Sequence, residues 1–289
     1  MRRPVITGVF VVALAAGGAA FRPVEPASEI RALAQPATST RPVDDTSSPE
    51  AAEQARGEDL LRRAGVLLRD AYSVRMAADV RQGDKHVRSD IGVDHHGNCS
   101  GTIDDGDGVA ARVVYLKGGA DTDGDGAGDG EDEAYVKYGD AALAVLETRA
   151  EAKGAEAGAR MRAFTGLARG KYVKAPSGPK GAQIIGRQCG VGRTLATTMI
   201  GGAAGTRALP DVRRDGELLT PLALPTRGGG GTAYVGAESD MRLHSMNGTT
   251  GGMRITITFS DYDKPFDVHT PDPAQVVEFP TDGGSVFEV

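Results

Sequence analysis

Carboxylates able to bind a hard cation gather in one glycine-rich segment near the middle of the chain. Asp121, Asp123 and Asp125 stand at alternate positions, a glycine follows at the sixth, and Asp129 lies further along. This spacing suits calcium, because oxygen ligands must wrap tightly around the ion. The twelfth position is Asp132, where an EF-hand loop has a bidentate glutamate. Two interpretations stay open: a structural calcium site formed by these five aspartates, or an acidic hairpin loop that stays in solvent.

The sequence shows no constellation of catalytic residues. It lacks the Gly-x-Ser-x-Gly pattern, the phosphate-binding Gly-x-x-x-x-Gly-Lys pattern and the paired spacing of zinc ligands. Ser177 and Lys180 have a Ser-x-x-Lys spacing, but Gly178 and Pro179 between them prevent the helical turn that this chemistry requires. We therefore expect a protein that is not an enzyme and that needs no cofactor, a structural calcium ion apart.

Composition narrows the classes of partner. The formal net charge is −6 at pH 7, which argues against nucleic acid and against electrostatic docking on anionic lipid head groups. Tryptophan is absent and aromatic residues make up 5%, so aliphatic side chains must form the core. Glycine is abundant, which favours many turns between strands over long helices.

The N-terminus has the features of an export signal over residues 1–20. Two arginines precede an apolar stretch, and a run of small residues ending at Ala20 provides a cleavage site. The alternative is an anchor that stays uncleaved, but Val5 to Ala20 spans 16 residues, fewer than the roughly 20 that cross a bilayer. Residues 21–49 are rich in Pro, Ala, Ser and Thr, and we expect them to form a disordered tether.

A helix and then a series of hairpins are predicted after the tether. Ser48, Pro49 and Glu50 supply a cap, a proline at the first helical position and an early acid. Apolar residues at helical spacing follow: Leu60, Leu61, Ala64, Leu67, Leu68 and Ala71. A helical interruption is expected from Ala141 to about Leu167. The predicted strands are antiparallel and run over residues 74–80, 87–93, 99–103, 109–116, 134–138, 171–174, 232–235, 241–246 and 253–259. Residues 211–224 are predicted to form a further hairpin, with Asp215-Gly216 as its turn.

The last strand and its continuation carry the most specific pattern. Ile255, Ile257 and Phe259 alternate with polar residues, and the turn Asp261-Tyr-Asp-Lys-Pro follows. Beyond it, two prolines predict an extended, irregular segment. Shorter matches precede this ending, at residues 94–102, 133–138, 170–174 and at Cys189. In this order, the segments resemble the extracytoplasmic lipoproteins of actinobacteria of the LppX/LprG type, within the LolA-like group.

This resemblance implies a fold and a broad role. For residues 50–280 it implies an α+β domain, in which a curved antiparallel half-barrel sheet carries helices across its concave side and encloses an apolar cavity. Residues 281–289 would be a tail. Such proteins bind or carry acyl chains. They also have an acylated cysteine just after the apolar stretch, whereas the first cysteine here is Cys99, which favours a secreted or loosely retained protein.

The two cysteines, Cys99 and Cys189, are predicted to form a disulfide. Cysteine pairs in exported proteins usually do so, and closing so long a loop stabilises by about 4–5 kcal/mol in the chain-entropy model. The alternative is a redox or catalytic thiol. The sequence contains no Cys-x-x-Cys, and the nearby His95 and His96 fall in a predicted turn, so a structural bridge is favoured.

If the sheet encloses a cavity, alternation along its strands predicts which side chains line it. The inward positions are Val74, Met76, Val113, Tyr115, Met241, Leu243, Ile255, Ile257 and Phe259. The alternative is that these residues form a closely packed core without room for a ligand. A cavity lining and a core have the same composition, so both interpretations stay open.

The sequence thus predicts a non-enzymatic, extracytoplasmic protein, secreted or associated with the cell envelope. We expect it to be a monomer that binds a lipid or another apolar small molecule. The alternative is a module that binds or senses an envelope protein, carries no lipid, and is stabilised by calcium. Co-purifying lipid would separate these two functions.

Overall fold

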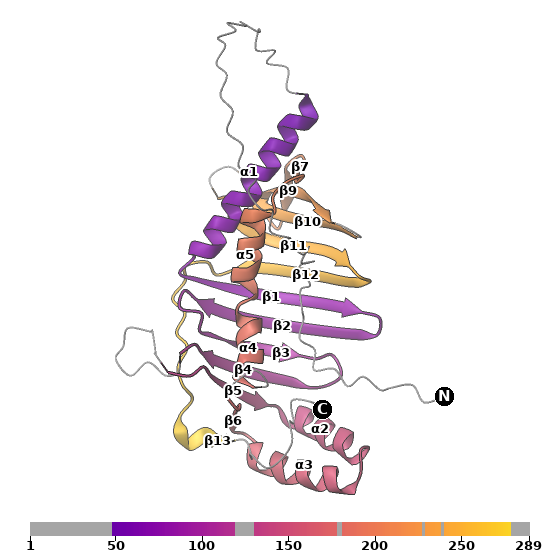
Figure 1. The fold of residues 1–289 in the computed structure, drawn as a ribbon, viewed down its shortest axis with the longest axis vertical. Helices are drawn as coiled ribbons and strands as arrows, with labels where there is room; N and C mark the ends of the chain where they lie inside the picture. The colour runs from indigo at the N-terminus through magenta and orange to yellow at the C-terminus, as the bar shows by residue number, and fades with distance from the viewer. Residues whose placement is uncertain (1–47, 119–129, 178–180, 227–228, 238–239, 279–289) are drawn as a thin grey trace, which may run out of the picture.

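The computed structural model describes residues 48–118, 130–177, 181–226, 229–237 and 240–278. Within these residues, five α-helices accompany one 13-stranded sheet. The sheet is curved and does not close into a barrel. The predicted α+β fold with an open, curved antiparallel sheet is therefore confirmed (Figure 1). The predicted signal peptide, tether and tail lie outside the described residues, apart from the end of the tether at residues 48 and 49.

One half of the sheet is a meander in which each strand pairs with the next in antiparallel fashion. Its strands are β1 (Ser73–Gln82), β2 (Lys85–Asp94), β3 (Cys99–Asp104), β4 (Ala110–Leu116), β5 (Glu133–Tyr138) and β6 (Tyr172–Lys174). Alternation places the side chains: in β1, Val74, Met76 and Val80 are buried while Arg75 is exposed. The face of β1 that carries the buried residues is therefore apolar. On the opposite face of this half, Val114, Leu116 and Tyr135 form a smaller apolar cluster.

The other half of the sheet is built from the C-terminal strands. They are β7 (Arg207–Ala208), β8 (Val212–Arg214), β9 (Glu217–Thr226), β10 (Gly229–Gly236), β11 (Leu243–Thr250) and β12 (Met253–Ser260). The predicted turn at Asp215 and Gly216 joins β8 to β9, and both residues have positive φ, as this kind of hairpin requires. The two halves join where β1 pairs with β12, with Met76 opposite Phe259.

Both edges of the sheet are short strands. At one edge lies the two-residue strand β7, and at the other lies β13 (Val276–Glu278), which pairs with β6 in parallel. The segment after β12, expected to be irregular throughout, thus ends in a 3-10 turn, η1 (Pro273–Gln275), and a strand. The turn forms because the Asp272 carboxylate accepts a hydrogen bond from the Ala274 amide at 2.9 Å.

Helix α1 (Pro49–Asp70) begins where the sequence predicts, with the Ser48 hydroxyl accepting a hydrogen bond from the Ala51 amide at 3.3 Å. Its buried side includes Leu61, Ala64 and Leu68. Leu67, which was expected on this side, is 41% exposed because it lies beside the stripe that meets the sheet. Glycines complete the buried side, and at Gly57 the helix touches the backbone of β7.

Two further helices, α4 (Ala182–Cys189) and α5 (Val191–Gly201), run almost in line across the strands on the face that α1 covers (Figure 1). The remaining pair, α2 (Asp140–Glu151) and α3 (Ala155–Ala168), lies at the β5–β6 end and packs around Val173. Within the described residues, none of these helices combines the length and apolar character needed to span a bilayer.

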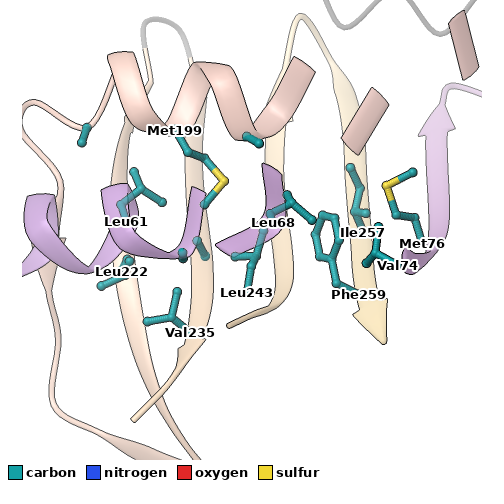
Figure 2. Close-up of a cluster of buried hydrophobic side chains, with 14 of the residues drawn as sticks. Leu61, Leu68, Val74, Met76, Met199, Leu222, Val235, Leu243, Ile257 and Phe259 are labelled. Atoms are coloured by element: carbon teal, nitrogen blue, oxygen red, sulfur yellow. The ribbon is translucent and has the colours of Figure 1, made fainter. Parts of the chain in front are cut away.

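The largest apolar cluster lies between α1, α5 and the C-terminal half of the sheet. Figure 2 shows Leu61 and Leu68 of α1 and Met199 of α5 beside sheet residues such as Leu243 and Phe259. A second cluster lies between α4 and strands β2–β5, and includes Ile91, Val113 and Ile185. The helix-covered face of the sheet therefore holds two separate regions of core.

Candidate ligand cavity

An apolar cavity of about 270 Å³ lies on the helix-covered face, where the two clusters meet. Its floor is the inward-facing set of alternate residues from six strands. These are Met76, Ala78, Val80, Val87, Ser89, Ile91, Ile103, Ala111, Val113, Val136, Tyr138, Ile255 and Ile257, together with Val109 just before β4. The volume falls just below the range of roughly 300–1,000 Å³ that is usual for small-molecule sites.

The roof of the cavity is the junction of α4 and α5. Ile184, Ile185 and Gln188 reach it from α4, and Val191 from the first turn of α5. No helix was predicted over α4, because the glycines around this segment lower helix propensity. The amphipathic spacing of Ile184, Ile185 and Gln188 is the signal that could have revealed the roof.

Several apolar residues that line the cavity are only half-buried, including Ala78, Val87, Ile103, Ala111 and Ile255. In a closely packed core, each such side chain would touch neighbours on all sides. Here they face a space that side chains of the described residues do not fill. The core is therefore incompletely packed at this point of the sheet, and apolar surface remains that a ligand could cover.

Few polar groups reach the cavity. Asp105 is the charged residue among those that line it, and its carboxylate is held by the Arg149 guanidinium at 3.3 Å and by the Val109 amide at 2.9 Å. Burial raises the pKa of the Tyr138 phenol to about 12, so this group is neutral at physiological pH. The cavity thus offers a neutral, mostly apolar environment, with Tyr138, Ser89 and Gln188 as hydrogen-bonding groups.

Cys99 and Cys189 form a disulfide, as the sequence predicts, with 5.8 Å between their Cα atoms. Both residues are buried. Cys99 begins β3 in the floor, and Cys189 ends α4 in the roof. The disulfide therefore ties the roof covalently to the sheet beside the cavity.

The structure distributes the nine predicted lining residues over three places. Met76, Val113, Ile255 and Ile257 line the apolar cavity. Val74 and Tyr115 line a second, more polar pocket on the other side of the α4–α5 junction, which Met76 also reaches. Of the remaining three residues, Leu243 and Phe259 lie in the C-terminal half of the sheet and Met241 lies just before it.

Leu243 and Phe259 belong to the packed cluster under α1 and α5. Met241 precedes β11, and its sulfur lies 3.9 Å from a guanidinium nitrogen of Arg63. Their role in ligand binding stays a prediction. Ala78 and Val80 were missed, although they share the parity of Met76 along β1.

Most of the predicted calcium ligands, namely Asp121, Asp123, Asp125 and Asp129, lie outside the described residues. Asp132 is described: its carboxylate accepts a hydrogen bond from the Gly118 amide at 3.1 Å and another from the Tyr115 hydroxyl. In the part of the chain that the structure describes, no three carboxylate, imidazole or thiol groups gather into a metal site. The calcium site stays a prediction.

No family model matches the chain, and no curated protein matches it. Among solved structures, LprF from Mycobacterium bovis is 13% identical, with a TM-score of 0.48 over 75% of this chain and 97% of its own. The lipoprotein LppX from Mycobacterium tuberculosis is 12% identical, with a TM-score of 0.40 over 74% of this chain and 98% of its own.

A DUF1329 family protein from Desulfovibrio piger is 12% identical, with a TM-score of 0.24 over 74% of this chain and 95% of its own.

Proposed function

We propose that this chain is a non-enzymatic, exported protein that binds a lipid or another apolar ligand in the cavity between the sheet and the α4–α5 roof. The observation that carries this proposal is the cavity itself, with half-buried aliphatic side chains from five strands around it. Its charged lining residue, Asp105, is already paired with Arg149. Such a lining can bind apolar surface, but it presents no activated nucleophile or acid–base pair.

The driving force for binding is the removal of apolar surface from water. Each buried methylene group contributes about 0.8 kcal/mol, and the effect is not directional. An aliphatic lining therefore selects ligands by volume and shape more than by functional group. The disulfide supports an extracytoplasmic location at or near the cell envelope, because disulfides persist in oxidising compartments.

Native mass spectrometry of the protein exported by its natural host tests this proposal. We expect a bound mass in the lipid range that disappears after organic extraction, and whose identity the extract then reveals. A bare polypeptide mass from a host that makes the natural lipids would contradict the proposal. It would favour the envelope-protein module, whose partner could then be sought by cross-linking.

A further inference from the structure

A second pocket, of about 350 Å³, lies across the α4–α5 junction from the apolar cavity. It is bounded by the C-terminal end of α1, the turn between β2 and β3, the end of β4 and the first turns of α5. Three basic side chains line it, Arg69, Lys117 and Arg193, together with His95. We call it the cationic pocket.

The carboxylates in and beside the cationic pocket are fewer than its basic side chains. Asp94 is the acidic residue among those lining it, and its oxygens already accept hydrogen bonds from the Gly97 amide and from Asn98. Arg69 is paired with the neighbouring Asp70, at 2.7 and 3.0 Å. Arg69, Lys117 and Arg193 against Asp70 and Asp94 therefore leave an excess of one positive charge at the pocket, on a chain whose formal net charge is −6.

Lys117 and Arg193 have no ion-pair partner among the described residues. One guanidinium nitrogen of Arg193 donates to the His95 carbonyl at 2.9 Å, which fixes the side chain at the pocket and leaves other N–H groups available. The Lys117 stem lies against Gly97. Two cations held beside one hollow are the arrangement that binds a phosphate or carboxylate group.

The apolar cavity and the cationic pocket share a wall. Met76 lines both, and its sulfur lies so close to Gly192 that a Cβ there would come within 2.7 Å. Met76 is therefore the side chain common to both linings, and methionine changes rotamer readily. Next to it, Gly186 of α4 lies directly on the Tyr115 ring.

We infer that the cationic pocket binds the anionic head of the same amphiphile whose apolar chain occupies the cavity, with Lys117 and Arg193 contacting its phosphate or carboxylate. This inference rests on the proposed function, since it assigns the polar end of the proposed ligand. The chain would pass beneath the α4–α5 junction at Met76. The ligand class is then an anionic amphiphile with a slender apolar chain.

Calorimetric titration of the lipid-free protein with decyl phosphate, decanol and inorganic phosphate tests the inference. The test variant is Lys117→Gln/Arg193→Gln. The control is Arg187→Gln, which removes an exposed arginine of α4 that lines neither hollow. We expect the test variant to bind decyl phosphate at least tenfold more weakly, because charge-assisted hydrogen bonds are lost. Decanol binding should stay within twofold in both variants.

The outcomes separate the inference from the proposed function. If decyl phosphate and decanol both bind and the test variant weakens neither, the head lies elsewhere and the inference is wrong. If inorganic phosphate binds through Lys117 and Arg193 as tightly as decyl phosphate does, the pocket is a free-anion site and the inference is again wrong. If neither amphiphile binds the unaltered protein, the proposed function itself fails.

Discussion

Ala77 and Ala78 are neighbours in β1 whose side chains lie on opposite faces of the sheet. Ala78 lines the apolar cavity, whereas Ala77 is exposed on the uncovered face. We predict that Ala78→Phe lowers ligand affinity at least tenfold, because the ring occupies the volume that the ligand needs. Ligand occupancy measured by native mass spectrometry, or affinity for decanol by calorimetry, checks this.

Ala77→Phe is the matched control, with the same added volume on the same strand. It should leave ligand affinity within twofold, since aromatic residues are well accepted on exposed strand faces. Thermal unfolding of both variants shows whether they fold. Equal affinity in two folded variants would show that the ligand does not occupy this cavity.

The raised pKa of Tyr138 makes the free energy of unfolding depend on pH in the alkaline range. Burial raises its pKa from the ordinary value near 10 to about 12 in the folded protein. Folding therefore favours the neutral phenol. The contribution of Tyr138 to the free energy of unfolding is fully present below pH 10 and is lost as the pH rises from about 10 to about 12. Urea unfolding at pH 8 and pH 11 should show a smaller loss of stability in Tyr138→Phe. An unchanged loss would place the titrating groups elsewhere.

The acidic segment permits a direct choice between its two interpretations. If Asp123 and Asp125 bind calcium, calorimetry should show saturable binding in the millimolar range that is typical of extracellular sites. The double variant Asp123→Asn/Asp125→Asn should then lose this heat. If binding persists in the double variant, or if the heat does not saturate, the segment is an acidic loop in solvent and not a calcium site.

At the scale of elements, Gly57 controls how closely α1 approaches the sheet. A Cβ at this position would lie 2.5 Å from the Ala208 backbone nitrogen, so alanine there forces α1 and β7 apart. We predict that Gly57→Ala destabilises the fold by about 1–3 kcal/mol in urea unfolding, as overpacking does. Gly166→Ala in α3 is the control: nothing lies within 4 Å of its Cβ, and helix propensity should raise stability by up to about 1 kcal/mol.

The disulfide joins the roof element to the floor element, so its loss should affect stability and binding together. We predict that Cys99→Ala/Cys189→Ala lowers the free energy of unfolding by up to about 4–5 kcal/mol and weakens ligand binding by loosening α4. A reductant should lower both the free energy of unfolding and the ligand affinity of the unaltered protein, and should change neither quantity in the double variant. If the variant keeps full affinity, the roof is held by its packing alone.

At the scale of the whole molecule, the sequence predicted those elements that depend on local patterns, namely on the alternation of side chains and on turn residues. Most of the strands, the Asp215-Gly216 turn and the start of α1 were visible as local patterns, whereas the short strands β7 and β13 were not. Helix α4 was not, because glycine-rich composition hid a short amphipathic helix whose packing on the sheet overrides its low propensity. Strand β13 was missed because its three residues depend on a distant partner, β6.

The sequence predicted which side chains of a strand face inward, but not which of these inward residues border the cavity. Met76, Val113, Ile255 and Ile257 follow from alternation, and the same rule would have added Ala78 and Val80. Whether an inward residue meets a helix or an empty space depends on where α1, α4 and α5 cross the strands. That crossing is set by tertiary packing, so Leu243 and Phe259 are core whereas Ile255 borders the cavity.

The pairing of β1 with β12 has a consequence for how the protein is made. These strands come from opposite ends of the described chain, yet they lie side by side in the middle of the sheet. The sheet therefore cannot be completed until almost the entire polypeptide has emerged, and pairings between distant segments form slowly. A chain with this topology stays unfolded, and hence able to thread through a translocation channel, for longer than one whose neighbouring strands pair in sequence throughout.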